Sequence, residues 1–153
     1  MSVAALTLRP AAPLDAGAAG AILHGFARAT PWMPCLMSGA EAVAHCDRMI
    51  ARGWVTVAEE AGTVQGFLAR EGDFIHAFYV AGGATGRGLG RALLDRAKME
   101  RPALSLRSFA ANGPALRFYR RAGFRRVAEG DGRDNDEGLP DLRLDWRREA
   151  GAR

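Results

Sequence analysis

The most informative part of the sequence is residues 74–100, FIHAFYVAGGATGRGLGRALLDRAKME. Phe74–Val80 is apolar on both alternating faces apart from His76, which predicts a central strand covered on two sides. The segment after the turn repeats apolar residues at helical spacing, which predicts an amphipathic helix. Between them, Gly86, Gly88 and Gly90 allow the backbone to pass close to a bulky ligand. A binding site is therefore expected where this helix begins.

The turn before this helix has the features of an anion site. The first amides of a helix have no partners within the helix, and together with the helix dipole they attract negative groups. Arg87 and Arg91 add positive charge there, so a diphosphate is the expected ligand. The glycines alternate, unlike the dinucleotide fingerprint G-x-G-x-x-G, and no P-loop lysine follows them. Taken alone, a purely structural turn remains an alternative.

A second motif follows at residues 112–124, NGPALRFYRRAGF. Asn112 is a suitable N-cap, Pro114 is tolerated in the first turn of a helix, and Gly123 is typical of a helix end. Asn112 and Tyr119 are seven residues apart, so on a helix they share one face two turns apart. Both side chains are therefore expected to face one extended ligand, although packing remains an alternative role for the tyrosine.

Together, residues 75–94 and 104–124 resemble the GNAT superfamily of acetyl-coenzyme A-dependent N-acetyltransferases, and residues 135–146 resemble the ending of its small bacterial members. The element order expected for the remaining sequence also fits, so residues 1–153 are expected to form a single N-acetyltransferase domain. The expected fold is mixed α/β (α+β), with a mostly antiparallel central sheet of six to seven strands and helices on both faces.

The resemblance also implies which positions contact the cofactor. They are Phe78, Tyr79, Val80, Gly86, Arg87, Gly88, Leu89, Gly90, Arg91, Asn112 and Tyr119. In the family, the strand pairs with the pantetheine arm through its backbone, the turn holds the pyrophosphate through main-chain amides, and the tyrosine protonates the departing thiolate. This chain departs from the family at Thr85, where Gln or Arg is usual, and at Gly82 and Gly83, which replace a common proline.

The implied reaction is transfer of the acetyl group of acetyl-CoA to a primary amine by direct attack. It needs a neutral nucleophile, stabilisation of the developing oxyanion and a protonated leaving group. An amide near Phe78–Val80 is the candidate oxyanion donor, and Tyr119 is the candidate acid. His76 is the candidate base, because it is expected on the same strand face as Phe78 and has a suitable pKa; a packed histidine is the alternative. Weaker candidates are Glu59, Glu60 and Glu137, and a water relay needs none of them.

Length and composition limit the classes of protein to which this chain can belong. The chain has 153 residues, 48% of them hydrophobic and 25% charged, which excludes a disordered chain, a collagen-like repeat and a disulfide scaffold. No apolar run approaches the ~20 residues of a spanning helix and no secretion signal is evident, so a cytoplasmic protein without a membrane partner is expected. Cys35 and Cys46 are then expected to be reduced, and neither they nor His24 and His45 have the spacing of a metal site.

Charge is unevenly distributed along the chain. Residues 86–126 hold eleven basic and two acidic residues, a net of +9, whereas residues 129–145 hold seven acidic and two basic, a net of −5. The first segment favours an anion, and the second favours a cationic acceptor such as a basic side chain, a polyamine or an amino-sugar drug. Trp32, Met33 and Met37 either line an acceptor pocket or pack beneath a loop.

Two other functional classes remain open at this point. A non-catalytic coenzyme A-binding regulator of the same fold would keep the binding turn and lose nothing if Tyr119 were Phe. A nucleic-acid-binding module is suggested by the arginines in residues 117–126, but no helix-turn-helix or stacking signature accompanies them. We therefore expect a small-molecule or peptide amine as partner and no nucleic acid, with a homodimer left open.

Overall fold

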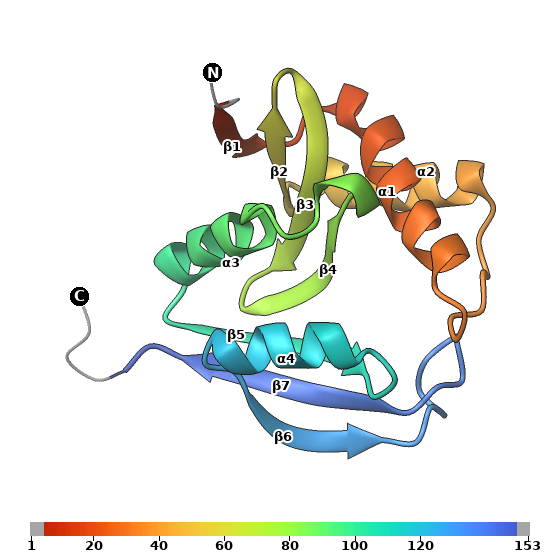
Figure 1. Ribbon diagram of the computed structural model, residues 1–153, viewed down its shortest axis with the longest axis vertical. Coiled ribbons are helices and arrows are strands. Elements are labelled where there is room, and N and C mark those ends of the chain that lie inside the picture. The colour runs from red at the N-terminus through yellow and green to blue at the C-terminus, as the bar shows by residue number, and fades with distance from the viewer. Residues whose placement is uncertain (1–4, 150–153) are drawn as a thin grey trace.

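The structure is a computed structural model that describes residues 5–149 as one seven-stranded sheet and four α-helices (Figure 1). The strands are β1 (Leu6–Pro10), β2 (Val55–Glu60), β3 (Thr63–Glu71), β4 (Phe74–Val80), β5 (Ala103–Phe109), β6 (Arg125–Gly130) and β7 (Asp141–Arg147). The helices are α1 (Ala16–Ala29), α2 (Gly39–Ala51), α3 (Leu89–Glu100) and α4 (Gly113–Arg121). Short 3₁₀ turns, Pro13–Asp15 and Gly82–Ala84, precede α1 and follow β4.

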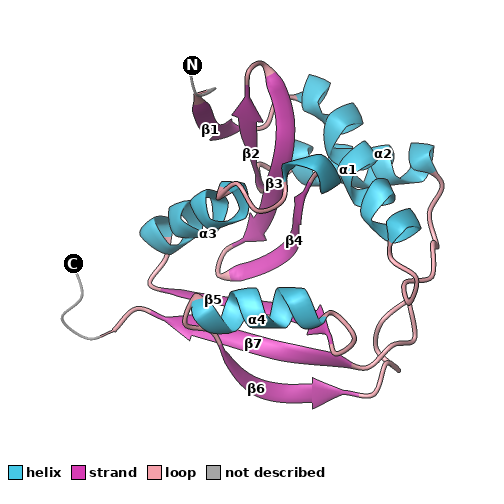
Figure 2. Ribbon diagram, in the orientation of Figure 1, coloured by secondary structure: helices cyan, strands magenta, loops and turns pink. Residues whose placement is uncertain are grey.

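The strands lie in the order β1-β2-β3-β4-β5-β7-β6 (Figure 2). Every neighbouring pair is antiparallel except β4 and β5, which are parallel because α3 crosses between them. The predicted mixed, mostly antiparallel sheet of six to seven strands is therefore confirmed, with seven strands present.

Two hydrophobic clusters cover the two faces of the sheet. One face packs against α3 and α4 through buried residues that include Leu89, Leu93 and Tyr119. The other packs against α1 and α2, with Cys46 and Phe67 fully buried. The predicted covering of β4 on both sides is thus observed, and each cluster contributes on the order of 25 cal/mol for every Å² of apolar surface it removes from water.

Local sequence signals set most element boundaries. Ser38 and Glu41 form a capping box at the start of α2, each accepting the other's backbone N–H at 3.1 and 3.0 Å. Asn112 caps α4 by accepting the Ala115 N–H at 3.2 Å. β6 is an exception and runs to Gly130 without such a signal. β6 is an edge strand with every residue exposed, so it carries no hydrophobic alternation to mark its end.

A β-bulge in β4 changes which residues share a face. Ala69 pairs with Ala77 and Arg70 pairs with Ile75, so His76 is an extra residue with no partner of its own on β3. The bulge turns Ile75, rather than His76, toward the cluster under α3 and α4 that also contains Phe78. The expectation that His76 shares the face of Phe78 is therefore wrong, because simple alternation fails at a bulge.

Lys98 joins α3 to α4 on the side of the sheet that carries Tyr119. Its ammonium group donates to the carbonyl of Ala122, directly after α4, and lies 5.1 Å from the centre of the Trp146 ring on β7. A cation on the last carbonyls of a helix opposes the negative end of its dipole. The C-terminal end of α4 is thereby held in place on α3 and β7.

Candidate active site

The parallel strands β4 and β5 separate soon after they begin to pair. Their register contains only two pairs, Phe74 with Ser105 and Ile75 with Leu106, and beyond these the strands diverge (Figure 1). A cavity of about 580 Å³ occupies the gap, bounded by the two strands, the N-terminal end of α3, α4 and part of α1. This cavity is the candidate active site, and we call it the main cavity.

The divergence leaves part of the β4 backbone facing the main cavity. Ala81 donates its N–H to the carbonyl of Gln65 at 2.7 Å, so the backbone groups of Ala81 point toward β3. In an antiparallel ladder alternate residues point the same way, so those of Tyr79 also face β3 while those of Phe78 and Val80 point away from it. With β5 no longer alongside, Phe78 and Val80 offer main-chain donors and acceptors to an extended ligand.

The start of α3 supplies further main-chain donors. Ala92 donates the first helical hydrogen bond, to the Gly88 carbonyl at 3.0 Å, so the amides of Leu89, Gly90 and Arg91 precede the hydrogen-bonded helix. Gly86 and Gly88 have φ angles of +80° and +82°, which L-residues rarely adopt. A Cβ on either would meet no protein atom within 4 Å. The turn is therefore open for the close approach of an anionic group to backbone N–H groups.

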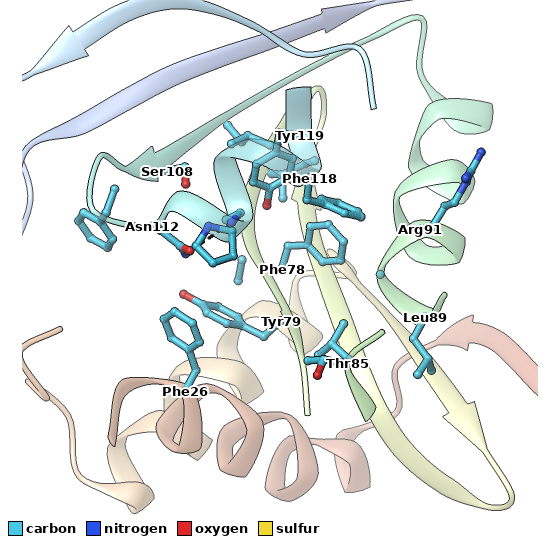
Figure 3. A pocket seen from close by; sticks show the side chains of 18 of the residues that line it. Phe26, Phe78, Tyr79, Thr85, Leu89, Arg91, Ser108, Asn112, Phe118 and Tyr119 are labelled. Atoms are coloured by element: carbon cyan, nitrogen blue, oxygen red, sulfur yellow. Dashed lines mark hydrogen bonds between the residues drawn. The ribbon is translucent and has the colours of Figure 1, made fainter. Parts of the chain in front are cut away.

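The two arginines of the turn have different surroundings. The Arg87 guanidinium lies 3.0 Å from the carboxylate of Glu60 on β2 and does not line the main cavity. Arg91 does line it, its side chain is 83% exposed, and Asp95 lies 3.8 Å away (Figure 3). Arg91 is thus free to approach a ligand, whereas Arg87 links the turn to the sheet.

Two side chains from α4 face the main cavity, as their spacing predicted (Figure 3). Asn112 uses its Oδ1 to cap the helix, which leaves its amide NH₂ group for a ligand. Tyr119 is buried among aromatic rings, with centroids 6.2 Å from Phe78 and 5.5 Å from both Phe118 and Phe124. Its hydroxyl is directed toward the space beside Phe78. Ring packing therefore fixes the direction of the phenol.

Burial controls the protonation of both tyrosines in this region. It raises the pKa of Tyr119 well above its ordinary range, and the neighbouring Tyr79 adds to the effect. Burial and then the Glu137 carboxylate raise the pKa of Tyr79 to about 12. Both phenols are protonated at neutral pH, which is the form that can donate a proton or a hydrogen bond.

The candidate bases are dispersed. The His76 imidazole accepts or donates a hydrogen bond with Glu71 at 2.9 Å and stacks on Trp54 with centroids 4.7 Å apart. These contacts favour the packing interpretation, although His76 does border the main cavity. Glu59 is paired with Arg9 at 3.1 Å, and Glu60 with Arg87. Glu137 does not line the main cavity, but it lines a smaller pocket that shares Tyr79 with it.

Aromatic residues that the sequence did not mark close the end of the main cavity opposite α3. Phe26 from α1 and Phe109 from the end of β5 line it together with Tyr79, and the centroids of Phe26 and Tyr79 are 5.3 Å apart (Figure 3). Trp32 packs behind them, 6.5 Å from Phe26 and 5.9 Å from Phe109. Phe26 belongs to the apolar side of α1, and helical spacing alone does not distinguish core from cavity wall.

Known proteins share both the sequence pattern and the fold. The acetyltransferase (GNAT) domain profile matches residues 51–126. A peptidyl-lysine N-acetyltransferase of Escherichia coli strain K12, YiaC, is 35% identical over 102 residues, which are 66% of this chain and 66% of that protein, just under two thirds of its length. The chain belongs to the GNAT family. The family resemblance inferred from the two motifs is therefore confirmed.

Solved GNAT structures match this chain along nearly its whole length. The structure of yncA from Salmonella typhimurium with its cofactor acetyl-CoA has a TM-score of 0.72 and 23% identity, and covers 97% of each chain. A ribosomal-protein-alanine N-acetyltransferase from Brucella melitensis has a TM-score of 0.73 and 23% identity, with 92% of this chain and 99% of that chain covered. At these identities the likeness establishes the fold.

The cofactor positions implied by the GNAT resemblance can be compared with the cavity. All of them line it except Arg87, whose side chain is held by Glu60. Leu89 is buried, so its expected contribution is its backbone amide. Among residues 5–149, no three metal-ligating side chains gather, and no helix is long and apolar enough to cross a bilayer.

Proposed function

We propose that this GNAT protein transfers the acetyl group of acetyl-CoA to a primary amine by direct attack. The main support is the opening between β4 and β5, where the free backbone of Phe78 and Val80 meets the amides at the start of α3. One extended molecule with a diphosphate at one end and a hydrogen-bonding arm at the other matches this row of donors and acceptors.

The residues have distinct proposed roles. The amides around Leu89, Gly90 and Arg91 hold the diphosphate, and the backbone of Phe78 and Val80 pairs with the arm. Asn112 orients the arm through its amide group. The glycine turn fits the group because nothing in the protein occupies the space above Gly86 and Gly88. The cavity therefore suits a long, thin, anionic carrier.

The chemical step needs three contributions from the protein. As the acceptor nitrogen bonds to the carbonyl carbon, the oxygen gains negative charge, which an amide near Phe78–Val80 stabilises. As the carbon–sulfur bond breaks, the Tyr119 hydroxyl donates a proton to the sulfur. The acceptor ammonium group must first lose one proton, to water or to a side chain at the acceptor end, to become the neutral amine that attacks. After the nitrogen has bonded to the carbonyl carbon it loses a second proton, which balances the proton that Tyr119 gives to the sulfur. His76 remains a proposed base, but its contacts with Glu71 and Trp54 do not favour that role.

The acceptor class has support from two directions. The chain is similar to a protein that acetylates lysine in peptides, and the end of the main cavity away from α3 is lined by the aromatic side chains of Phe26, Tyr79 and Phe109. We therefore propose a peptide lysine as the acceptor, with its alkyl chain lying against Phe26 and Tyr79.

Two measurements test this proposal. Acetyl-CoA binding to the native state alone raises the melting temperature, because a ligand adds RT ln(1 + [L]/Kd) to the stability. Release of free CoA is then measured with lysine peptides and a panel of other primary amines. No thermal shift at millimolar acetyl-CoA contradicts cofactor binding. A shift without CoA release from any amine would instead support a non-catalytic CoA-binding protein.

A further inference from the structure

A smaller chamber of about 70 Å³ adjoins the acceptor end of the main cavity. The two spaces share Phe26, Met33, Tyr79 and Phe109 in their walls. The remaining wall comes mainly from apolar residues of α1 and of the segment between α1 and α2. Glu137, from the segment between β6 and β7, is the one acidic residue among the described residues that line it. We call this space the side chamber.

Glu137 is partly buried and has no cationic partner within the described chain. No arginine, lysine or histidine of residues 5–149 lies within 4.0 Å of its carboxylate, although eleven other acidic residues there have such a partner. The chain has a net charge of +4, so cations are abundant. A half-buried carboxylate is costly when unpaired and gains most from a cation placed beside it.

The backbone around Glu137 is held by Asn135. The Asn135 side chain donates to the Leu139 carbonyl at 2.8 Å and accepts the Leu139 N–H at 3.2 Å. The Gly138 N–H donates to the Asn135 carbonyl at 3.2 Å, and a Cβ on Gly132 would lie 2.6 Å from the Gly138 backbone. The loop is thus tied across Glu137, and its carboxylate is placed at the chamber before any ligand arrives.

The chamber matches one kind of acceptor better than others. Its aromatic walls favour a cation, and a carboxylate beside them forms a charge-assisted hydrogen bond with an ammonium group. At about 70 Å³ the side chamber is much smaller than the main cavity of about 580 Å³. A space of this size suits the end of a flexible alkyl chain better than a sugar ring.

We infer that the side chamber receives the ammonium end of an unbranched alkylamine, such as a lysine side chain, and that Glu137 is the residue that recognises its charge. This inference rests on the proposed function, because an acceptor held here would lie beside the gap where acetyl transfer is proposed. Glu137 acts as a specificity-determining residue and not as part of the CoA-binding surface.

The test compares two peptides that differ only in the ammonium group. A short peptide with a central lysine, and the same peptide with norleucine, are titrated by calorimetry into the protein alone and into the protein loaded with CoA. CoA carries no acetyl group, so no reaction consumes the peptide. We expect the wild type to prefer lysine by about tenfold, which is about 1.4 kcal/mol. Glu137→Gln is expected to lose this preference without weakening the norleucine peptide.

Matched variants separate charge recognition from loop damage. Asp136→Asn removes a neighbouring exposed carboxylate and is expected to keep the preference. Glu137→Asp retains the negative charge and is expected to keep part of the preference for lysine. In turnover with a lysine peptide, Glu137→Gln is expected to raise KM about tenfold with little change in kcat. An amino-sugar acceptor is expected to give no CoA release.

The outcomes distinguish the two proposals. An unchanged lysine preference in Glu137→Gln, or no preference in the wild type, overturns the role of Glu137 while acetyl transfer to amines stands. Wild-type protein that binds no CoA overturns the proposed function, and the peptide comparison without CoA still decides the charge recognition. Equal losses of the lysine preference in Asp136→Asn and Glu137→Gln would also overturn the role of Glu137, because they would show a nonspecific effect of the acidic loop.

Discussion

The two ends of the main cavity are built in different ways. At the α3 end, the groups that face the cavity are main-chain amides of β4 and of the turn with Gly86 and Gly88. At the other end they are side chains: Phe26 and Phe109 line the main cavity from two separate segments, and Glu137 lines the adjoining side chamber from a third. A backbone site tolerates most sequence changes and accepts one invariant ligand, whereas a side-chain site can be altered one residue at a time. This difference suits an enzyme with a fixed acyl donor and a variable acceptor.

The largest expected effect is at the α3 end, in Gly88→Val. We expect acetyl-CoA binding to weaken by more than a hundredfold, because a branched side chain would fill the open space above the turn and strain its φ of +82°. Binding is measured by calorimetry. The matched control is Gly72→Val in the β3–β4 turn, where φ is +58° and a Cβ also meets nothing. Similar loss of binding in both variants would show that strain, not blocking, is responsible.

Tyr119→Phe tests the part of the main cavity that lies between its two ends. We expect kcat to fall about a hundredfold, which is the usual scale of general acid catalysis, while the Kd for acetyl-CoA stays nearly constant. The aromatic packing with Phe78, Phe118 and Phe124 is retained, so the melting temperature is expected to change little. Steady-state kinetics and calorimetry provide the check. Unchanged kcat would remove Tyr119 as the acid and favour the non-catalytic alternative.

Alkaline pH is expected to lower the stability of the fold through two buried groups, the phenol of Tyr79 and the thiol of Cys46. The pKa of Tyr79 is about 12 in the folded protein against an ordinary 10.0, and that of the Cys46 thiol is about 11 against 9.0, both because of burial. The unfolded chain therefore releases these protons first, and stability falls as pH rises. We expect a loss on the order of 2 kcal/mol between pH 9 and pH 11, measured by urea unfolding. Tyr79→Phe should flatten this profile; an identical slope would contradict the assignment.

The smallest effect is expected for Arg87→Ala, although this residue lies in the glycine turn. Its guanidinium is paired with Glu60 at a half-exposed site, and such ion pairs contribute about 0–1 kcal/mol. We expect the Kd for acetyl-CoA to change by less than about threefold. Arg91→Ala, whose side chain lines the main cavity, is the comparison. A larger effect at Arg87 than at Arg91 would show that side-chain charge contributes at this end after all.

The two ends also differ in how far the sequence predicted them. At the α3 end, the glycine turn and the start of the helix lie where the sequence predicted them, because glycines before an amphipathic repeat are a local signal. The contacts predicted there with a cofactor stay a prediction. The helix cap at Asn112 was predicted for the same reason.

The acceptor end could not be assembled from sequence because its walls come from distant segments. Nothing local distinguishes Phe26 as cavity wall from core, or Glu137 from the other acidic residues of its loop. The prediction that His76 shares the strand face of Phe78 was wrong for another reason. A bulge depends on how β3 and β4 pair, which a period-2 pattern within one strand does not contain.

Among the 21 arginines and lysines of this chain, Lys98 is the one lysine, and its amino group is occupied by the Ala122 carbonyl and the Trp146 ring. Arginine carries the same charge but is not a nucleophile at neutral pH. With the peptide-lysine acceptor proposed above, surface lysines would make each copy of the protein a substrate for the others at high concentration. Because arginine supplies nearly all of its positive charge, the protein remains cationic and offers other copies almost no lysine to modify.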